Sequence, residues 1–365
     1  MNAERLHAIV IVLSQEMNKG NTPSKMEELI NALQNVVNQS SHPPHQQTLA
    51  QNLKAMYASV TDTQSDSFSP AWRQILREIG GEDLFGKQLK LNIENVFARN
   101  QITPAVALDE LRQIQKRLQA FKKSLDEAAS SLRHFQIGDE KLGPGECEIG
   151  ILIPRAAVNN QLLDFADELK ELGFILNTFS EVATGKKDEL SIRTISSSDL
   201  LVHLQAAAPY AACLAVAIER VVTVYKQLLE IRKLRLELKK QGVPDEQATG
   251  IGNYANQLME TEIEKIAVET VNEYHKKDDK GRKNELTNAV RISLNKVANR
   301  IDHGFNLEVR VEPIVKKKDE EKENAEIQRA IAAIQSATAN MQFMKLEGQP
   351  ILRLPEAKEK PKKKE

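Results

Sequence analysis

The stretch PAVALDELRQIQKRLQAFKKSLDEAASSLRHF, residues 104–135, decides the class of fold. Thr103 can cap a helix whose first turn begins with Pro104. Apolar residues then recur in alternating steps of four and three from Ala107 to Phe135, which is the heptad pattern of a helix that packs lengthwise on another helix. We therefore expect one helix of about 32 residues, roughly 48 Å long at ~1.5 Å per residue.

The apolar stripe of this helix needs a partner, because one helix cannot bury its own stripe. The partner is either the helix expected at 217–238 of the same chain or the same helix of a second chain. We expect the first for most of the stripe and a contact between subunits at one exposed end. The residues of this interaction seam are Leu111, Ile114, Leu118, Phe121, Leu125 and Leu132.

The region before the long helix, residues 1–100, is predicted to be an N-terminal helical domain. Pro23, Pro43 and Pro70 stand at expected helix starts, and apolar residues follow each of them at helical spacing. The long heptad helix, residues 101–142, would connect this domain to the next one.

Residues 143–313 have a different pattern, in which β-branched runs alternate with turn residues, as is typical of strands. The order along the chain is strand, helix, strand, strand, long helices and a last strand at 305–313. It resembles the order of a ferredoxin-like β-α-β-β-α-β unit with long helices inserted before its final strand. The runs are GPGECEIGILIP, a helix that ends at Gly173, FILNTFSEVATG and ELSIRTI as a hairpin, and a third β-like run at 200–206.

One uncharged run, residues 200–218, is the membrane candidate of the chain. Pro209 interrupts this run, and His203 and Gln205 add polar groups to its first half. A buried strand followed by the start of a packed helix explains the run better than a membrane-spanning helix. Heptad spacing then continues to Leu238 in a second long helix.

These patterns together predict a predominantly α-helical α+β protein, with long antiparallel heptad helices and a small ferredoxin-like antiparallel sheet unit. Residues 314–365 are expected to form a charged linker, an amphipathic helix and a disordered Lys-rich tail. The predicted helix includes Met341 and Met344, and the tail begins at Pro355.

The composition limits the possible partners. The 365 residues carry 50 Lys and Arg against 51 Asp and Glu, so the chain has no global field that attracts nucleic acid or anionic lipid. Aromatic residues make up only 4%, which argues against single-strand binding by base stacking. The two cysteines and seven scattered histidines lack the spacing of a metal site. We therefore expect no metal, no cofactor and reduced thiols in a cytoplasmic protein.

The run ISSSDLLVH, residues 195–203, raises the question of a serine nucleophile. It contains Ser196, Ser197, Ser198 and Asp199. A catalytic serine needs a base within hydrogen-bond reach and donors for an oxyanion. His203 is near in sequence, but alternation places it on a strand, and no elbow motif surrounds the serines. A bend between two strands is the better interpretation.

The sequence favours a non-enzymatic scaffold or regulatory protein that self-associates or binds protein partners through long amphipathic helices. One alternative is a ligand-binding protein or enzyme with a site between the small sheet and its helices. Glu181 and Arg193, together with residues 196–199, would form that site. A second alternative is a weak nucleic-acid binder that uses basic helix faces and the tail.

Overall fold

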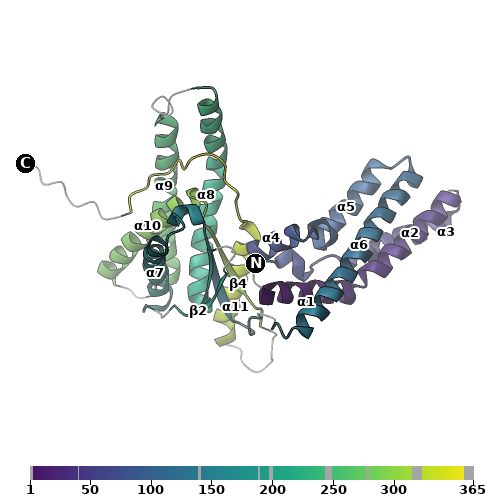
Figure 1. Ribbon diagram of the computed structural model, residues 1–365, viewed down its shortest axis with the longest axis horizontal. Coiled ribbons are helices and arrows are strands. Elements are labelled where there is room, and N and C mark those ends of the chain that lie inside the picture. Colours follow the sequence, from purple (N-terminus) through teal and green to yellow (C-terminus); the bar gives the residue numbers. More distant parts are fainter. Residues whose placement is uncertain are drawn as a thin grey trace, which may run out of the picture. The chain divides into compact units, whose positions relative to one another are not determined.

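The computed structural model divides the chain into two compact units, residues 1–141 and 142–365 (Figure 1). Helices make up most of the described residues, and the one sheet among them has four antiparallel strands. The predicted class, a predominantly helical α+β protein, is confirmed. The described residues are 3–39, 41–138, 141–187, 190–196, 200–242, 249–276, 279–314 and 323–356.

Several helices of the N-terminal unit begin at prolines. Pro43, Pro70 and Pro104 each open a helix, where a missing backbone N–H costs no hydrogen bond. The long helix expected from Pro104 is confirmed as α6. The elements are α1 Ala3–Gly20, α2 Thr22–Asn38, α3 Pro43–Ser59, the 3-10 turn Gln64–Ser67, α4 Pro70–Glu78, the 3-10 turn Glu82–Leu84, α5 Gly86–Arg99 and α6 Pro104–His134.

The helix α6 lies in the core of this unit, packed against α1, α2 and α5. The ring of Phe121 is half-buried and meets that of Phe85 edge-on, with 5.9 Å between centroids, and Leu132 is half-buried. We expected the helix at 217–238 to cover the stripe, and this was wrong because α1 and α2 supply the cover. The seam residues that are buried in this core are Leu111, Ile114, Leu118 and Leu125.

The C-terminal unit contains the sheet, whose strand order is β2-β3-β1-β4 with antiparallel pairing throughout. The last strand pairs along the first, although several helices separate them in the chain. This confirms the prediction that the strand expected at 305–313 joins the sheet near 148–206. The strands are β1 Cys147–Ile153, β2 Ile192–Ser196, β3 Leu200–Ala206 and β4 Asn306–Val311.

The two faces of the sheet differ in chemistry, because successive residues of a strand point to opposite faces. The odd-numbered residues of β1, from Cys147 to Ile153, are buried in an apolar core with α7, α8 and α10. The even-numbered Glu148 and Gly150 share the other face with their antiparallel partners. These partners are Gln205 and Arg310 for Glu148, and His203 and Glu308 for Gly150.

The helix α8 is central to this unit and packs against α7, α9, α10 and α11. Figure 1 shows α8 and α9 side by side, and the two helices are in contact. The helical elements are the 3-10 turn Arg155–Val158, α7 Leu162–Thr184, α8 Ala208–Lys240, α9 Thr249–Tyr274, α10 Lys280–Asp302 and α11 Glu323–Asn340.

The uncharged run 200–218 is divided between two elements. It contains all of β3, and α8 begins at Ala208 because Pro209 fits the first turn of a helix. In the described part of the chain, α8 alone has the length and apolar composition of a membrane-spanning helix. Of its most apolar window, 67% is buried inside the structure, and a packed core helix passes the same test of composition.

The predicted hairpin of residues 174–185 and 189–195 is wrong in its first half. The helix α7 continues through Gly173 as far as Thr184, and only β2 remains of the hairpin. Packing at helical spacing outweighs the strand propensity of the run. The residues of this run and its approach that are buried at that spacing are Leu172, Ile175, Leu176, Phe179 and Val182.

The chain after β4 returns across the unit. Helix α11 packs on α8 and along β4, where the Thr338 hydroxyl donates to the Val309 carbonyl at 2.9 Å. We predicted a helix that includes Met341 and Met344, but α11 ends at Asn340, whose carbonyl accepts from Lys226 Nζ at 2.7 Å. The tail was expected to begin at Pro355, but Pro355 and Glu356 are held by side chains of α10. The rest of the expected tail lies outside the described residues.

Candidate functional site

Residues 341–356, here called the C-terminal segment, cross the C-terminal unit without forming a helix or a strand (Figure 1, yellow). Although the segment lacks regular structure, several of its apolar side chains belong to the main core of the unit. The buried ones are Met341, Ile351, Leu352 and Leu354. The segment is therefore a docked polypeptide.

A buried ion pair joins the segment to α8 and α10. Arg232 of α8 is 5% exposed and Asp302 of α10 is fully buried, with 2.6 Å between Nη1 and Oδ1. The remaining Arg232 donors bind main-chain carbonyls of the segment, Nε at Glu347 (2.7 Å) and Nη2 at Gly348 (2.6 Å). Burial raises the pKa of Tyr225, whose hydroxyl donates to Asp302 Oδ1 at 2.6 Å.

The second carboxylate oxygen of Asp302 binds the segment directly. Oδ2 accepts the backbone N–H groups of Ile351 and Leu352, each at 2.6 Å. One buried carboxylate thus contacts α8 through Arg232 and Tyr225, and the segment through two consecutive amides. Bonds to an ionised acceptor are the stronger class of hydrogen bond, so this residue fixes the local path of the segment.

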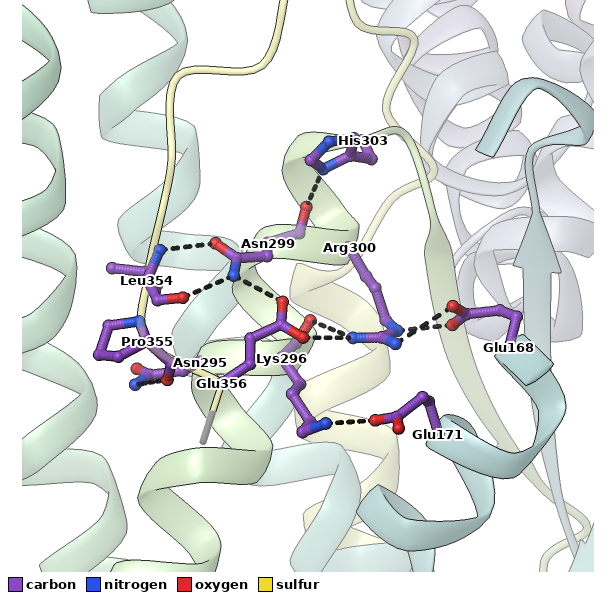
Figure 2. A network of polar contacts seen from close by, with 10 residues as sticks. All are labelled: Glu168, Glu171, Asn295, Lys296, Asn299, Arg300, His303, Leu354, Pro355 and Glu356. Atoms are coloured by element: carbon purple, nitrogen blue, oxygen red, sulfur yellow. Dashed lines mark hydrogen bonds and ion pairs between the residues drawn. The ribbon is translucent and has the colours of Figure 1, made fainter. Parts of the chain in front are cut away.

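Asparagines continue the same mode of contact toward the end of the segment (Figure 2). The Asn299 side chain accepts from the Leu354 N–H and donates to the Leu354 carbonyl, both at 3.0 Å, as a neighbouring strand would. Asn295 Nδ2 donates to the Pro355 carbonyl at 2.8 Å. On α9, Asn256 accepts the Arg353 N–H at 2.7 Å.

Both ends of this contact region have further anchors. At the start, Asn306 of β4 accepts the Met344 N–H at 2.8 Å. At the other end, the Glu356 carboxylate accepts from Asn299 Nδ2 at 2.7 Å and lies 3.7 Å from Arg300 Nη1. Figure 2 shows Arg300 between Glu356 and Glu168 of α7, which it contacts at 2.6 Å.

The site holds the main chain of the chain's own extended segment. Side chains of the surrounding elements supply donors and acceptors that match its peptide groups, so these contacts do not depend on the side chains of the segment. The buried side chains of Ile351, Leu352 and Leu354 each contribute about 1.5–3 kcal/mol through apolar burial.

The residues proposed from the sequence for a ligand site have other partners. Glu181, in the last turn of α7, forms an ion pair with Arg282 of α10. Arg193, on β2, lies 3.0 Å from Glu146 and 3.7 Å from Glu148. These two residues therefore take part in separate ion pairs.

The serine run lies at the junction of β2 and β3. Ser196 is the last residue of β2 and is buried. Ser197, Ser198 and Asp199 lie outside the described residues. The described neighbours β2 and β3 are antiparallel, and Ser196 pairs with Leu201.

The polar face of the sheet carries a second cluster of ionisable side chains. His203 Nδ1 lies 3.2 Å from Glu148 Oε1, and both residues are buried. Gly150 stands between His203 and Glu308, and a Cβ there would meet the Glu308 Cγ at 2.9 Å. A carboxylate can orient an imidazole as a general base through a hydrogen bond, but within the described part of the chain neither ring nitrogen of His203 has a hydrogen-bond partner. No three His, Cys, Asp or Glu side chains among the described residues are grouped to hold a metal ion.

Sequence reasoning missed the C-terminal site, although two signals were present. Asn295, Asn299 and Asp302 recur in steps of four and three, which places three polar side chains on one face of a helix. Residues 351–354 read ILRL, and three of these four residues are apolar, although they directly precede the Lys-rich tail.

Compared with known proteins, the chain matches no family model, no curated protein and no solved structure.

Proposed function

We propose that the chain is a non-enzymatic interaction and assembly protein of the cytoplasm, whose C-terminal unit binds an extended polypeptide segment on α8, α9 and α10. The observation that carries this proposal is the binding of main-chain groups of the segment by side chains of three helices and one strand. The helix side chains are Arg232, Asn256, Asn295, Asn299 and Asp302, and the strand side chain is Asn306 of β4.

The energetics of the site support a binding role. A buried ion pair is often no more stabilising than apolar residues of the same volume, so packing alone does not require Arg232 and Asp302. Without the segment, Arg232 would lose two carbonyl acceptors and Asp302 would lose two N–H donors. Unmatched polar groups of this kind are costly, so the site requires a polypeptide occupant.

The test uses the full chain with Ile351→Asp and Leu352→Asp, which removes the docked segment from its site. A labelled peptide of residues 345–358 is added, and its fluorescence anisotropy is followed. We expect binding in the range of ~1–100 µM, because ordering the peptide offsets much of the contact energy. A peptide that carries the same two substitutions is the matched control. Equal signals from both peptides, with the protein folded by circular dichroism, would contradict the proposal.

We also propose that the sheet belongs to a ferredoxin-like unit with inserted helices. Two features support this: the strand order β2-β3-β1-β4 and the antiparallel pairing of every neighbour. The helix α7 stands between β1 and β2, and α8 to α10 stand between β3 and β4, as the β-α-β-β-α-β order with an insertion requires.

The alternative function is an enzyme or ligand-binding protein that uses the polar face of the sheet. The proximity of Glu148 to His203 favours it, because a buried carboxylate and imidazole side by side are groups that general acid–base chemistry uses. Native mass spectrometry of the purified protein would test it. A bound small molecule that is lost with His203→Gln, and kept with Gln205→Asn, would support this alternative.

The nucleic-acid alternative has less support. Basic residues of α6 pair with acids one turn away, as in Arg112 with Asp109 and Lys122 with Asp126, so this face is locally neutral. A mobility shift that disappears between low and moderate salt would be the expected sign of tail contacts alone.

A further inference from the structure

We propose that the C-terminal arm, which is α11 together with the C-terminal segment (residues 323–356), is exchanged between two copies of this chain. The arm of each copy then occupies the site on α8, α9 and α10 of the other. This inference rests on the proposed function and names the partner as a second copy of the same chain.

The connectivity of the arm permits such an exchange. The arm follows β4 through residues 312–322 alone, and its described contacts are with elements of the C-terminal unit that precede it in the chain. Helix α11 buries Ala330, Ile331, Ile334 and Ala337, and the segment after it buries four apolar residues more. Every one of these contacts forms equally well when the arm comes from a second copy.

The chemistry of the site selects this occupant. The buried Arg232 and Asp302 need an extended main chain of defined path. Arg300, which is paired with Glu168 at 2.6 Å, also has the acidic Glu356 of the segment 3.7 Å from its Nη1. The run of residues 351–356, ILRLPE, provides both features together with the apolar side chains that fill the core. A second copy of the chain therefore presents the matching ligand in full.

The closed monomer and the reciprocal dimer contain the same contacts, so their balance depends on protein concentration. Dimerisation costs the translational and rotational entropy of one molecule, and it buries no new polar group at the site. We therefore expect the dimer to gain population as concentration rises and to exchange subunits slowly, because each exchange breaks the contacts of two arms.

Two complementary variants of the full chain test the exchange. The site variant carries Asn295→Leu and Asn299→Leu, which remove the main-chain contacts at Leu354 and Pro355 without leaving an unpaired charge. The arm variant carries Ile351→Asp and Leu352→Asp. Neither variant can dock its own arm in its own site. The site variant still has an intact arm, and this arm fits the intact site of the arm variant.

The readout is a fluorophore on the exposed residue 353 of the site variant, attached after Arg353→Cys. The native thiols do not compete, because Cys147 and Cys213 are buried and burial raises the pKa of Cys147 to about 12. We expect the anisotropy to rise when the unlabelled arm variant is added, and sedimentation to show a one-to-one complex. A chain that carries all four substitutions is the matched control and should give no rise.

The outcomes separate the two proposals. If the labelled arm stays free while the peptide of residues 345–358 still binds the arm variant, exchange is overturned and the proposed function stands. If neither binds, both fail. A measurement without substitutions guards against misfolded variants: isotope-labelled and unlabelled wild-type chains are mixed and examined by native mass spectrometry. Mixed dimers support exchange, and a monomer at every concentration overturns it.

Discussion

The two longest helices, α6 with 31 residues and α8 with 33, bury their apolar faces in different ways. In the N-terminal unit, α6 is covered by the apolar faces of other helices, and its ion pairs are exposed. In the C-terminal unit, part of the cover of α8 is an extended segment held by the buried Arg232. The first cover is spread over many side chains, whereas the second depends on a few polar groups.

This difference separates a core from a binding site. An apolar core spreads its stabilisation over many side chains, each of which costs about 2–5 kcal/mol to truncate to alanine. Breaking a buried ion pair costs a similar ~3–5 kcal/mol at a single point, because the other charge is left unmatched. The C-terminal segment therefore has a localised energy of attachment, which is what a releasable element needs.

The largest expected effect is on the α6 side of this comparison. Leu118→Asp places an unpaired carboxylate at a fully buried position and should lower the free energy of unfolding by more than about 4 kcal/mol. The N-terminal unit should then fail to fold, as measured by urea denaturation followed by circular dichroism. Leu132→Asp, at a half-buried position of the same helix, is the control and should cost about 1 kcal/mol. A folded Leu118→Asp protein would mean that the stripe is not the core.

The next largest effect is expected in the C-terminal unit, where the segment covers α8. Asp302→Asn leaves Arg232 buried without its counter-charge and weakens the contacts with Ile351 and Leu352, at a cost of about 3–5 kcal/mol. Hydrogen exchange of the backbone amides of residues 351–354 should accelerate before that of α6. Glu82→Gln is the control, since its pair with the exposed Arg77 contributes less than about 1 kcal/mol. Equal protection in both variants would show that the segment is not held by the ion pair.

The elements that the sequence predicts well are those with long, uniform periods. The apolar stripe of α6 repeats over its whole length. The alternation of apolar residues in β4 predicts a strand, and a strand far from the others in the chain must pair with the sheet, as β4 does with β1. The strand prediction for the run after Gly173 was wrong. The β-branched and aromatic residues of this run suit a strand, while the spacing of Ile175, Phe179 and Val182 suits a helix. Packing against the rest of the core decides between these readings, and a single sequence does not contain that packing.

A smaller effect sharpens the distinction between main-chain and side-chain recognition in the segment. Leu354→Ala removes a buried side chain and should cost about 2–3 kcal/mol, detected as a lower melting temperature of the C-terminal unit. Arg353→Ala, at the neighbouring exposed position, keeps its backbone contact with Asn256 and should change nothing measurable. Equal losses from both substitutions would show that the segment does not dock with the described side chains inward.

The candidate site was harder to predict than the fold for a physical reason. Its contacts join residues far apart in the chain, such as Arg232 with Gly348, and they use main-chain atoms that every residue has. The asparagine stripe on α10 is visible in the sequence, but its partner is not. A polar stripe normally indicates a solvent-exposed face, so only the position of the segment identifies its role.

The smallest effect is expected where the segment ends. Removal of residues 357–365 takes away nothing apolar larger than Ala357 and Pro361, and the melting temperature should stay within about 1 °C.

Glu356→Gln, in contrast, weakens the contacts of this carboxylate with Asn299 and Arg300. The side chain is 40% exposed, so solvent screening limits its contribution to less than about 1 kcal/mol, or ~2–4 °C. The substitution is a cleaner test than truncation before Glu356, because truncation would create a new carboxylate on Pro355 close to Arg300. The difference between Glu356→Gln and the wild type should shrink in 1 M salt, at a Debye length of ~3 Å. A loss of several degrees on removing 357–365 alone would show that the localised attachment extends beyond Glu356.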